Sequence, residues 1–211
     1  MRWLAVLLLL LAHVVPGEAQ AVAQVLAVPG TYGTLNQNDL ALRVRNDELE
    51  IRFIPLDPQV TSLLASDAFQ SLRSLVETKR RAIDSVASRA GISDPGLALV
   101  SFFGLRADTR FDPQILTLLV RNRVFQPLGV IPISTKFDSQ QLNAREQASA
   151  IYLFQEDIPV NDSFSLSYGA LLSEDWHNKQ TVLDRERARV SARARSEQAK
   201  RPSERADTTT K

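Results

Sequence analysis

The stretch QILTLLVRNRVFQPLGVIPIS, residues 114–134, is the most apolar part of the chain after its leader, and it decides the fold class. Residues 115–120 form a short apolar run rich in branched side chains, and a second apolar run follows from Val124. This pattern is typical of a buried strand, a turn and a returning strand. Because side chains alternate along a strand and both faces of 115–120 are apolar, we expect this strand to be central in a packed sheet. Pro132 cannot donate a ladder hydrogen bond, so the returning strand is expected at an edge or a bulge.

Several other segments alternate between apolar and polar residues. Residues 40–45 and 48–53 predict two half-buried strands joined by a tight turn, in which Arg43 and Arg45 face Glu48 and Glu50. A further alternating strand is expected over 163–168, and two strands with apolar residues on both faces are expected over 97–105 and 148–155. With the central pair, the chain contains about seven short strands at spacings typical of an antiparallel sandwich.

One long amphipathic helix interrupts the strands. Asp57-Pro58 and Ser66-Asp67 are start signals, and Gly91 is a stop signal. Between them the apolar residues recur at helical spacing, namely Phe69, Leu72, Val76, Ile83, Val86 and Ala90. We expect this stripe to pack on the sheet.

These elements predict a mainly β fold. The expected architecture is an immunoglobulin-like or fibronectin-like antiparallel β-sandwich over 39–177, with the helical insertion at 57–91. The alternative is an α+β two-layer fold in which the helix lies across one sheet. The comparison covers strand spacing only and indicates no particular family.

The N-terminus has the features of an export signal. Met1-Arg2 is a short positive region, an apolar core follows, and two A-x-A sites lie near 19–23. We therefore expect a signal peptide over 1–21, a turn-rich linker over 22–38, and an exported protein that is periplasmic or extracellular if the source is bacterial. The alternative is an uncleaved N-terminal anchor, although the apolar core is short for a membrane span.

Composition excludes several kinds of site. The chain has no cysteine, which rules out disulfides, thiolate metal sites and a thiol nucleophile. His177 is the only histidine after the leader, so a metal site built from several histidines is excluded. Carboxylates in predicted loops, Asp108 with Asp112 and Asp157 with Asp162, are candidates for calcium binding or acid–base catalysis, but turn formation explains them equally well. We expect no metal and no cofactor.

The C-terminal region 178–211 is charged and basic. Residues 184–211 contain nine Lys or Arg and five Asp or Glu, a net charge of +4, whereas the remaining 16 basic and 19 acidic residues give −3. The apolar stripe of this segment is thin, so we expect a marginal helix that leads into a disordered end. The candidate partner-binding residues are Arg185, Arg189, Arg193 and Arg195.

The sequence thus predicts a binding module and does not identify its partner. We expect an exported, non-enzymatic binding or assembly module of the cell envelope. It would hold a protein partner or an acidic envelope component, and the basic tail would add electrostatic attraction. Near-balanced charge argues against a nucleic-acid partner. The alternative is an exported hydrolase that uses the loop carboxylates Asp157 and Asp162.

Overall fold

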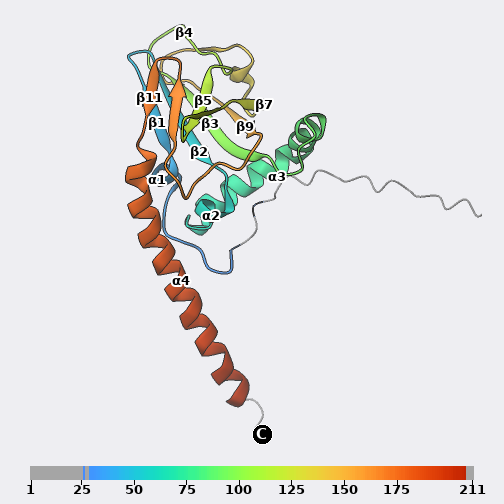
Figure 1. Cartoon of the computed structure of the whole chain (residues 1–211), viewed down its shortest axis with the longest axis vertical. Coiled ribbons are helices and arrows are strands. Elements are labelled where there is room, and N and C mark those ends of the chain that lie inside the picture. The colour runs from blue at the N-terminus through green and yellow to red at the C-terminus, as the bar shows by residue number, and fades with distance from the viewer. Residues whose placement is uncertain (1–25, 27–28, 208–211) are drawn as a thin grey trace, which may run out of the picture.

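The computed structural model describes Leu26 and residues 29–207, with side chains described up to Ala199. In this part the chain is mainly β, with eleven strands in three antiparallel sheets and one long C-terminal helix (Figure 1). None of the described helices is both long and apolar enough to cross a bilayer. The predicted signal peptide lies outside the described residues.

The larger sheet has five strands in the order β1-β2-β3-β9-β7. Their bounds are Leu42–Arg45, Leu49–Pro55, Gly96–Gly104, Gln147–Phe154 and Pro127–Pro132. The first two strands form the predicted hairpin. Arg45 lies opposite Glu50 as expected, but Glu48 lies in the turn and Arg43 faces Arg52.

The smaller sheet has four strands in the order β11-β10-β5-β6. Their bounds are Leu171–Ser173, Ser165–Tyr168, Leu116–Val120 and Arg123–Phe125. The short strands β4 (Thr109–Arg110) and β8 (Gln141–Leu142) pair separately.

Aromatic side chains fill the space between the larger and the smaller sheet. The ring of Phe53 lies 6.2 Å from that of Phe164, and Phe102 lies 6.0 Å from Tyr168. The hydroxyl of Tyr152 donates to the carbonyl of Pro113 at 3.0 Å, and burial raises the pKa of this phenol. These contacts form a continuous core between the sheets.

Helix α3 (Ser66–Arg89) covers the opposite face of the larger sheet. Ile151 and Leu153 alternate with the inward-facing Tyr152, yet both are fully buried, which requires a layer on that face. The apolar stripe of α3 supplies this layer, and Val86 occupies the space that a side chain at Gly129 of β7 would fill. The described part of the chain also contains three short helices: α1 (Gln37–Leu40), α2 (Pro58–Thr61) and the 3₁₀ helix η1 (Thr135–Phe137).

Helix α4 (Trp176–Asp207) begins in the core and then leaves the β-rich body (Figure 1). Trp176 is fully buried and its indole donates to the carbonyl of Val160 at 3.1 Å. Leu183 and Glu186 are also buried, whereas most side chains farther along the described part of the helix are exposed.

Residues 114–134 occupy a different position from the one expected. Residues 116–120 form β5, an interior strand, but it belongs to the smaller sheet, and α3 packs on the other one. Only the face with Leu116, Leu118 and Val120 is buried, while Ile115 is 42% exposed. The returning chain crosses between sheets: β6 pairs with β5, and β7 is an edge strand of the larger sheet with a register shift between Pro127 and Gly129. The edge position inferred from Pro132 is therefore confirmed.

The expected count of about seven strands was too low. Strands β4, β6, β8 and β11 contain two or three residues each, which is too short to produce a visible alternation in the sequence. None of the three sheets closes on itself. The inserted helix between the first hairpin and the remaining strands is confirmed as α3.

Candidate functional site

The four arginines predicted to bind a partner all lie on α4. Arg185 and Arg195 are exposed, and Arg195 donates to the carbonyl of Ser191 one turn earlier at 3.2 Å. Arg189 and Arg193 donate to the carboxylate of Glu186 at 3.3 and 3.2 Å. Arg189 nevertheless leaves 69% of its side chain exposed. The structure therefore divides the set into two arginines that pair with Glu186 and two that have no carboxylate partner among the described residues.

Glu186 connects α4 with the N-terminal part of the domain. Its side chain is 1% exposed, and its carboxylate also accepts hydrogen bonds from the backbone N–H and the hydroxyl of Thr34, at 2.8 and 3.0 Å. A buried carboxylate is stable only when it is paired and hydrogen-bonded, and here four donors meet that need. The predicted linker thus includes residues held firmly against α4.

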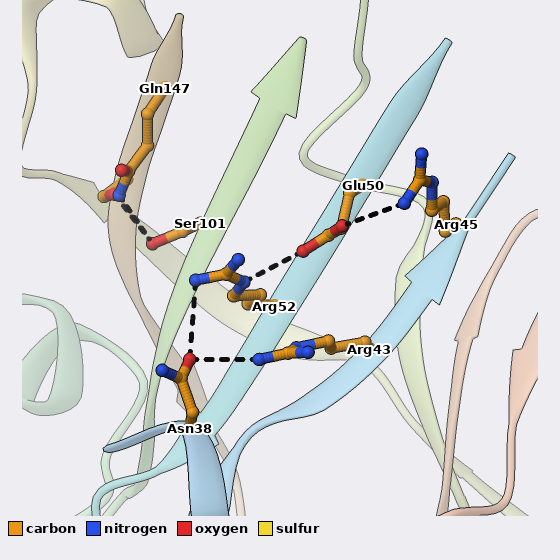
Figure 2. Close-up of polar contacts among 8 residues, drawn as sticks. Asn38, Arg43, Arg45, Glu50, Arg52, Ser101 and Gln147 are labelled. Atoms are coloured by element: carbon orange, nitrogen blue, oxygen red, sulfur yellow. Dashed lines mark hydrogen bonds and ion pairs between the residues drawn. The ribbon is translucent and has the colours of Figure 1, made fainter. Parts of the chain in front are cut away.

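A second polar surface lies on the outer face of the larger sheet, beside the area that α3 covers. Figure 2 shows a chain of contacts that runs from Arg45 through Glu50 and Arg52 to Asn38 and Arg43. The alternation of β1 and β2 directs these charged side chains away from the core. Arg52 also lies over the ring of Phe103, with 4.5 Å between its guanidinium carbon and the ring centroid.

Asn38 is the point where this surface meets α1. The helix has a capping box, in which the Asn36 side chain accepts from the Asn38 N–H and Asp39 accepts from the Asn36 N–H. This fixes the start of α1 and places the Asn38 side chain beside β1. Its amide oxygen accepts from Arg43 at 3.1 Å and from Arg52 at 3.5 Å (Figure 2).

The same surface ends in a row of neutral polar groups. The hydroxyls of Ser101 and Ser149 lie 2.8 Å apart, and the side-chain amide of Gln147 donates to both, at 3.2 and 2.8 Å. Figure 2 shows Ser101 on β3, which is next to β2, and Gln147 on β9, the strand after β3. These groups form hydrogen bonds with one another, and the row carries no net charge.

A recess of about 330 Å³ lies between α1, β1 and the first turns of α4. Arg43, Asp39, Asp175, Lys179 and Val182 are among its lining residues. Lys179 donates to the backbone carbonyl of Asp39 at 3.0 Å. Burial lowers the pKa of Lys179, Asp39 and Asp175 raise it, and nearby Arg43 lowers it further. The recess therefore holds two cations close enough to repel each other.

His177 lines a larger open recess of about 780 Å³ with Ser163, Glu174 and Asp175. Its Nδ1 atom lies 3.4 Å from the hydroxyl of Ser163, and both side chains are exposed. This separation is at the long limit of a hydrogen bond, and in the described structure no carboxylate forms an ion pair with the imidazole. The recess thus lacks the arrangement that activates a serine nucleophile.

The loop carboxylates occupy separate surroundings. Asp162 is paired with Arg121 at 2.8 Å. The pKa of Asp157 is raised, first by burial and then by the charge of Asp94, and burial also raises the pKa of Asp57. The recess between Asp57 and Asp157 has a volume of only about 20 Å³, which is room for about one water molecule and not for a substrate.

The other predicted carboxylate pair is used in local structure. Asp108 accepts a hydrogen bond from the side chain of Gln141, and Asp112 accepts one from the N–H of Gln114. Among the described residues, no three His, Asp or Glu side chains are grouped so that they could hold a metal ion.

Comparison with protein-family models, curated proteins and solved structures gives no match for this chain. The site must therefore be interpreted from its own chemistry. Sequence reasoning found the tail arginines and the charged hairpin but missed the role of Asn38 and Lys179. The capping-box pattern at Asn36–Asp39 was a usable signal for the first, whereas the approach of Lys179 to α1 depends on tertiary packing alone.

Proposed function

We propose that this chain is an exported, non-enzymatic binding or assembly module of the cell envelope that holds an acidic protein partner through α4. The observation that carries this proposal is the long, basic α4, which leaves the body with only its first turns buried (Figure 1). Residues 176–199 include six Lys or Arg and three Asp or Glu. Beyond Glu186 most described side chains of α4 are exposed, so this part of the helix gains little from packing on its own domain, and a partner surface is a natural source of further stabilisation.

The β-rich body serves as a rigid support in this proposal. An immunoglobulin-like sandwich remains our proposed description of that support, based on the two antiparallel sheets and their shared aromatic core. A sandwich of this kind can present loops and sheet edges to a partner.

The experiment compares retention of envelope proteins by two charge variants. The immobilised full chain is incubated with envelope extract of its source cell at low and high salt. Arg185→Gln combined with Arg195→Gln removes two solvated cations and leaves the Glu186 contacts intact. The matched control is Arg81→Gln combined with Arg106→Gln, at two exposed positions elsewhere.

We expect one acidic protein to be retained at low salt and released at high salt. Two exposed ion pairs contribute about 0.2–1 kcal/mol each, so the tail variant should weaken retention roughly fivefold while the control variant retains the protein. Equal retention by both variants, or retention that does not respond to salt, would contradict the role of α4.

Export is tested separately by fractionation. The chain isolated from the envelope of its source cell should have a new N-terminus near 19–23, measured by mass spectrometry. An intact Met1 in the membrane fraction would indicate the uncleaved anchor, and recovery from the cytoplasm would contradict export.

A further inference from the structure

Three cationic side chains converge on Asn38. Arg43 and Arg52 are directly opposite in the β1–β2 register, and like charges in such a cross-strand pair destabilise a sheet. Both guanidinium groups donate to the same neutral atom, the amide oxygen of Asn38, at 3.1 and 3.5 Å. Lys179 approaches from α4 and donates to the carbonyls of Asn38 and Asp39, at 3.4 and 3.0 Å.

The cations of this cluster are incompletely compensated. Arg52 has an ion pair with Glu50 at 2.9 Å, but within the described part of the chain Arg43 and Lys179 have no carboxylate at ion-pair distance. Asp39 and Asp175 line the same recess, yet their oxygens accept from Asn36 and Ser173. An amide oxygen thus occupies the position in which a carboxylate would form much stronger, charge-assisted bonds.

The recess beside this cluster has the size and lining for one acidic side chain. Its volume is about 330 Å³, and Ala41 and the 42% exposed Val182 provide an apolar wall for a methylene stem. We infer that the Arg43–Lys179 recess binds a carboxylate group of an acidic protein segment. This inference rests on the proposed function and deepens it, because it names the site that binds the acidic partner.

The remainder of the acidic segment has a path along α4. Val182 in the recess is followed at helical spacing by Arg185 and Arg189, which lie on the same side of the helix. A segment whose first carboxylate occupies the recess therefore meets further cations in the direction of the tail. Asp39 and Asp175 disfavour a dianion, so the singly charged carboxylate suits this site better than phosphate does.

The test measures binding of a fluorescein-labelled hexaglutamate peptide to the purified full chain by fluorescence anisotropy at low salt. Arg43→Gln removes an exposed guanidinium whose only described polar contact is the Asn38 oxygen. Arg81→Gln is the matched control on the exposed side of α3. We expect Arg43→Gln to weaken binding about tenfold and Arg81→Gln to leave it unchanged.

A second variant supplies the missing carboxylate from the chain itself. Asn38→Asp should form ion pairs with Arg43 and Arg52, raise the melting temperature and weaken hexaglutamate binding at least about tenfold. The Asn38 side-chain amide resonance of the parent protein should also shift when the peptide is added.

Several outcomes would overturn the inference. These are hexaglutamate affinity unchanged by both Arg43→Gln and Asn38→Asp, equal loss in Arg81→Gln, or inorganic phosphate binding in place of the peptide. The outcome is independent of the envelope experiment, because it uses purified components. If the hexaglutamate test fails but the chain still retains an envelope protein, only the recess is excluded and the proposed function stands. If the hexaglutamate test succeeds but no envelope protein is retained, the recess stands and the proposed function fails.

Discussion

Glu186 is the residue on which the attachment of α4 depends most. Its carboxylate binds Thr34 from the N-terminal segment and Arg189 and Arg193 from its own helix. Glu186→Ala removes the acceptor of the Thr34 N–H and hydroxyl and the partner of two cations, so the free energy of unfolding should fall by roughly 2–4 kcal/mol. Urea denaturation measures this change.

The control for this prediction is Glu197→Ala. Glu197 is exposed and accepts only a 3.4 Å contact from Thr31, so its loss should change stability by less than about 0.5 kcal/mol. If both variants unfold at the same urea concentration as the parent protein, Glu186 does not anchor the helix.

Asp157 should lower the free energy of unfolding as pH rises, whereas a paired carboxylate raises it. Its pKa in the folded protein is raised above the ordinary value of 3.8 by burial and by Asp94, so the folded state disfavours the charged form. The resulting cost is absent below pH 3.8, where the group is protonated in both states, and develops as pH rises through the raised pKa. Asp157→Asn should therefore stabilise the protein more at pH 7 than at pH 4, as measured by urea denaturation at both values.

Asp138→Asn is the comparison variant, since Asp138 is an exposed residue at the end of η1. It should not reproduce the pH-dependent gain. A gain from Asp157→Asn that is the same at pH 4 and pH 7 would show that the carboxylate charge is not the cause.

At the scale of elements, β5 has one buried and one partly exposed face. Leu118→Asp places an unpaired charge between the two sheets and should prevent folding, because its cost exceeds what a marginally stable domain tolerates. Leu119→Asp lies on the partly exposed face and should fold with a loss of about 1–2 kcal/mol. Circular dichroism and soluble yield separate the two, and equal behaviour would mean that the faces of β5 are wrongly assigned.

The contact between β7 and α3 depends on the missing side chain at Gly129. A Cβ atom there would lie 2.5 Å from Cγ1 of Val86, and a β-branched side chain has little freedom to move away. Gly129→Ala should cost about 1–3 kcal/mol, whereas Gly30→Ala, which meets nothing within 4 Å, should be neutral. Adding Val86→Ala should recover part of the loss in a double-mutant cycle. Additive effects of the two substitutions would argue against this contact.

The elements that the sequence predicted well are those with a long periodic signal. The stripe from Phe69 to Ile83 spans several turns, the alternation in β1 and β2 spans four to seven residues, and β9 is a largely apolar segment of eight residues. What periodicity does not contain is the partner of each strand. For β5, an apolar composition on both faces suggested a central position, although the half-buried Leu119 faces away from the core. The crossing of the chain from β6 to β7 was visible only as a proline-rich interruption.

The candidate site residues likewise divide into those that the sequence indicates and those that only tertiary packing brings together. The basic composition of α4 was readable from the sequence, but Glu186 looked like any other charged residue of a solvated helix. Its burial depends on Thr34, which lies 152 positions earlier in the chain. The convergence of Arg43, Arg52 and Lys179 on Asn38 is likewise a product of tertiary packing, which no local pattern encodes.

At the scale of the whole molecule, α4 combines a structural part with a solvated part, and truncation should separate them. A chain that ends after Ala194 keeps Leu183, Glu186 and the Arg193 contact. Its melting temperature should stay within about 2 °C of the parent value, because the described side chains that are lost, residues 195–199, are exposed. A chain that ends after Val182 loses the buried Leu183 and the Glu186 contacts, which together stabilise the fold by roughly 4–7 kcal/mol. That loss approaches the whole stability of an ordinary domain, so the shorter chain should be largely unfolded at 37 °C.

Calorimetry of the two truncated chains measures these effects. A cooperative transition of the shorter chain near the parent melting temperature would show that the body does not need α4. A large drop in the melting temperature of the longer chain would show that contacts beyond residue 194 stabilise the fold.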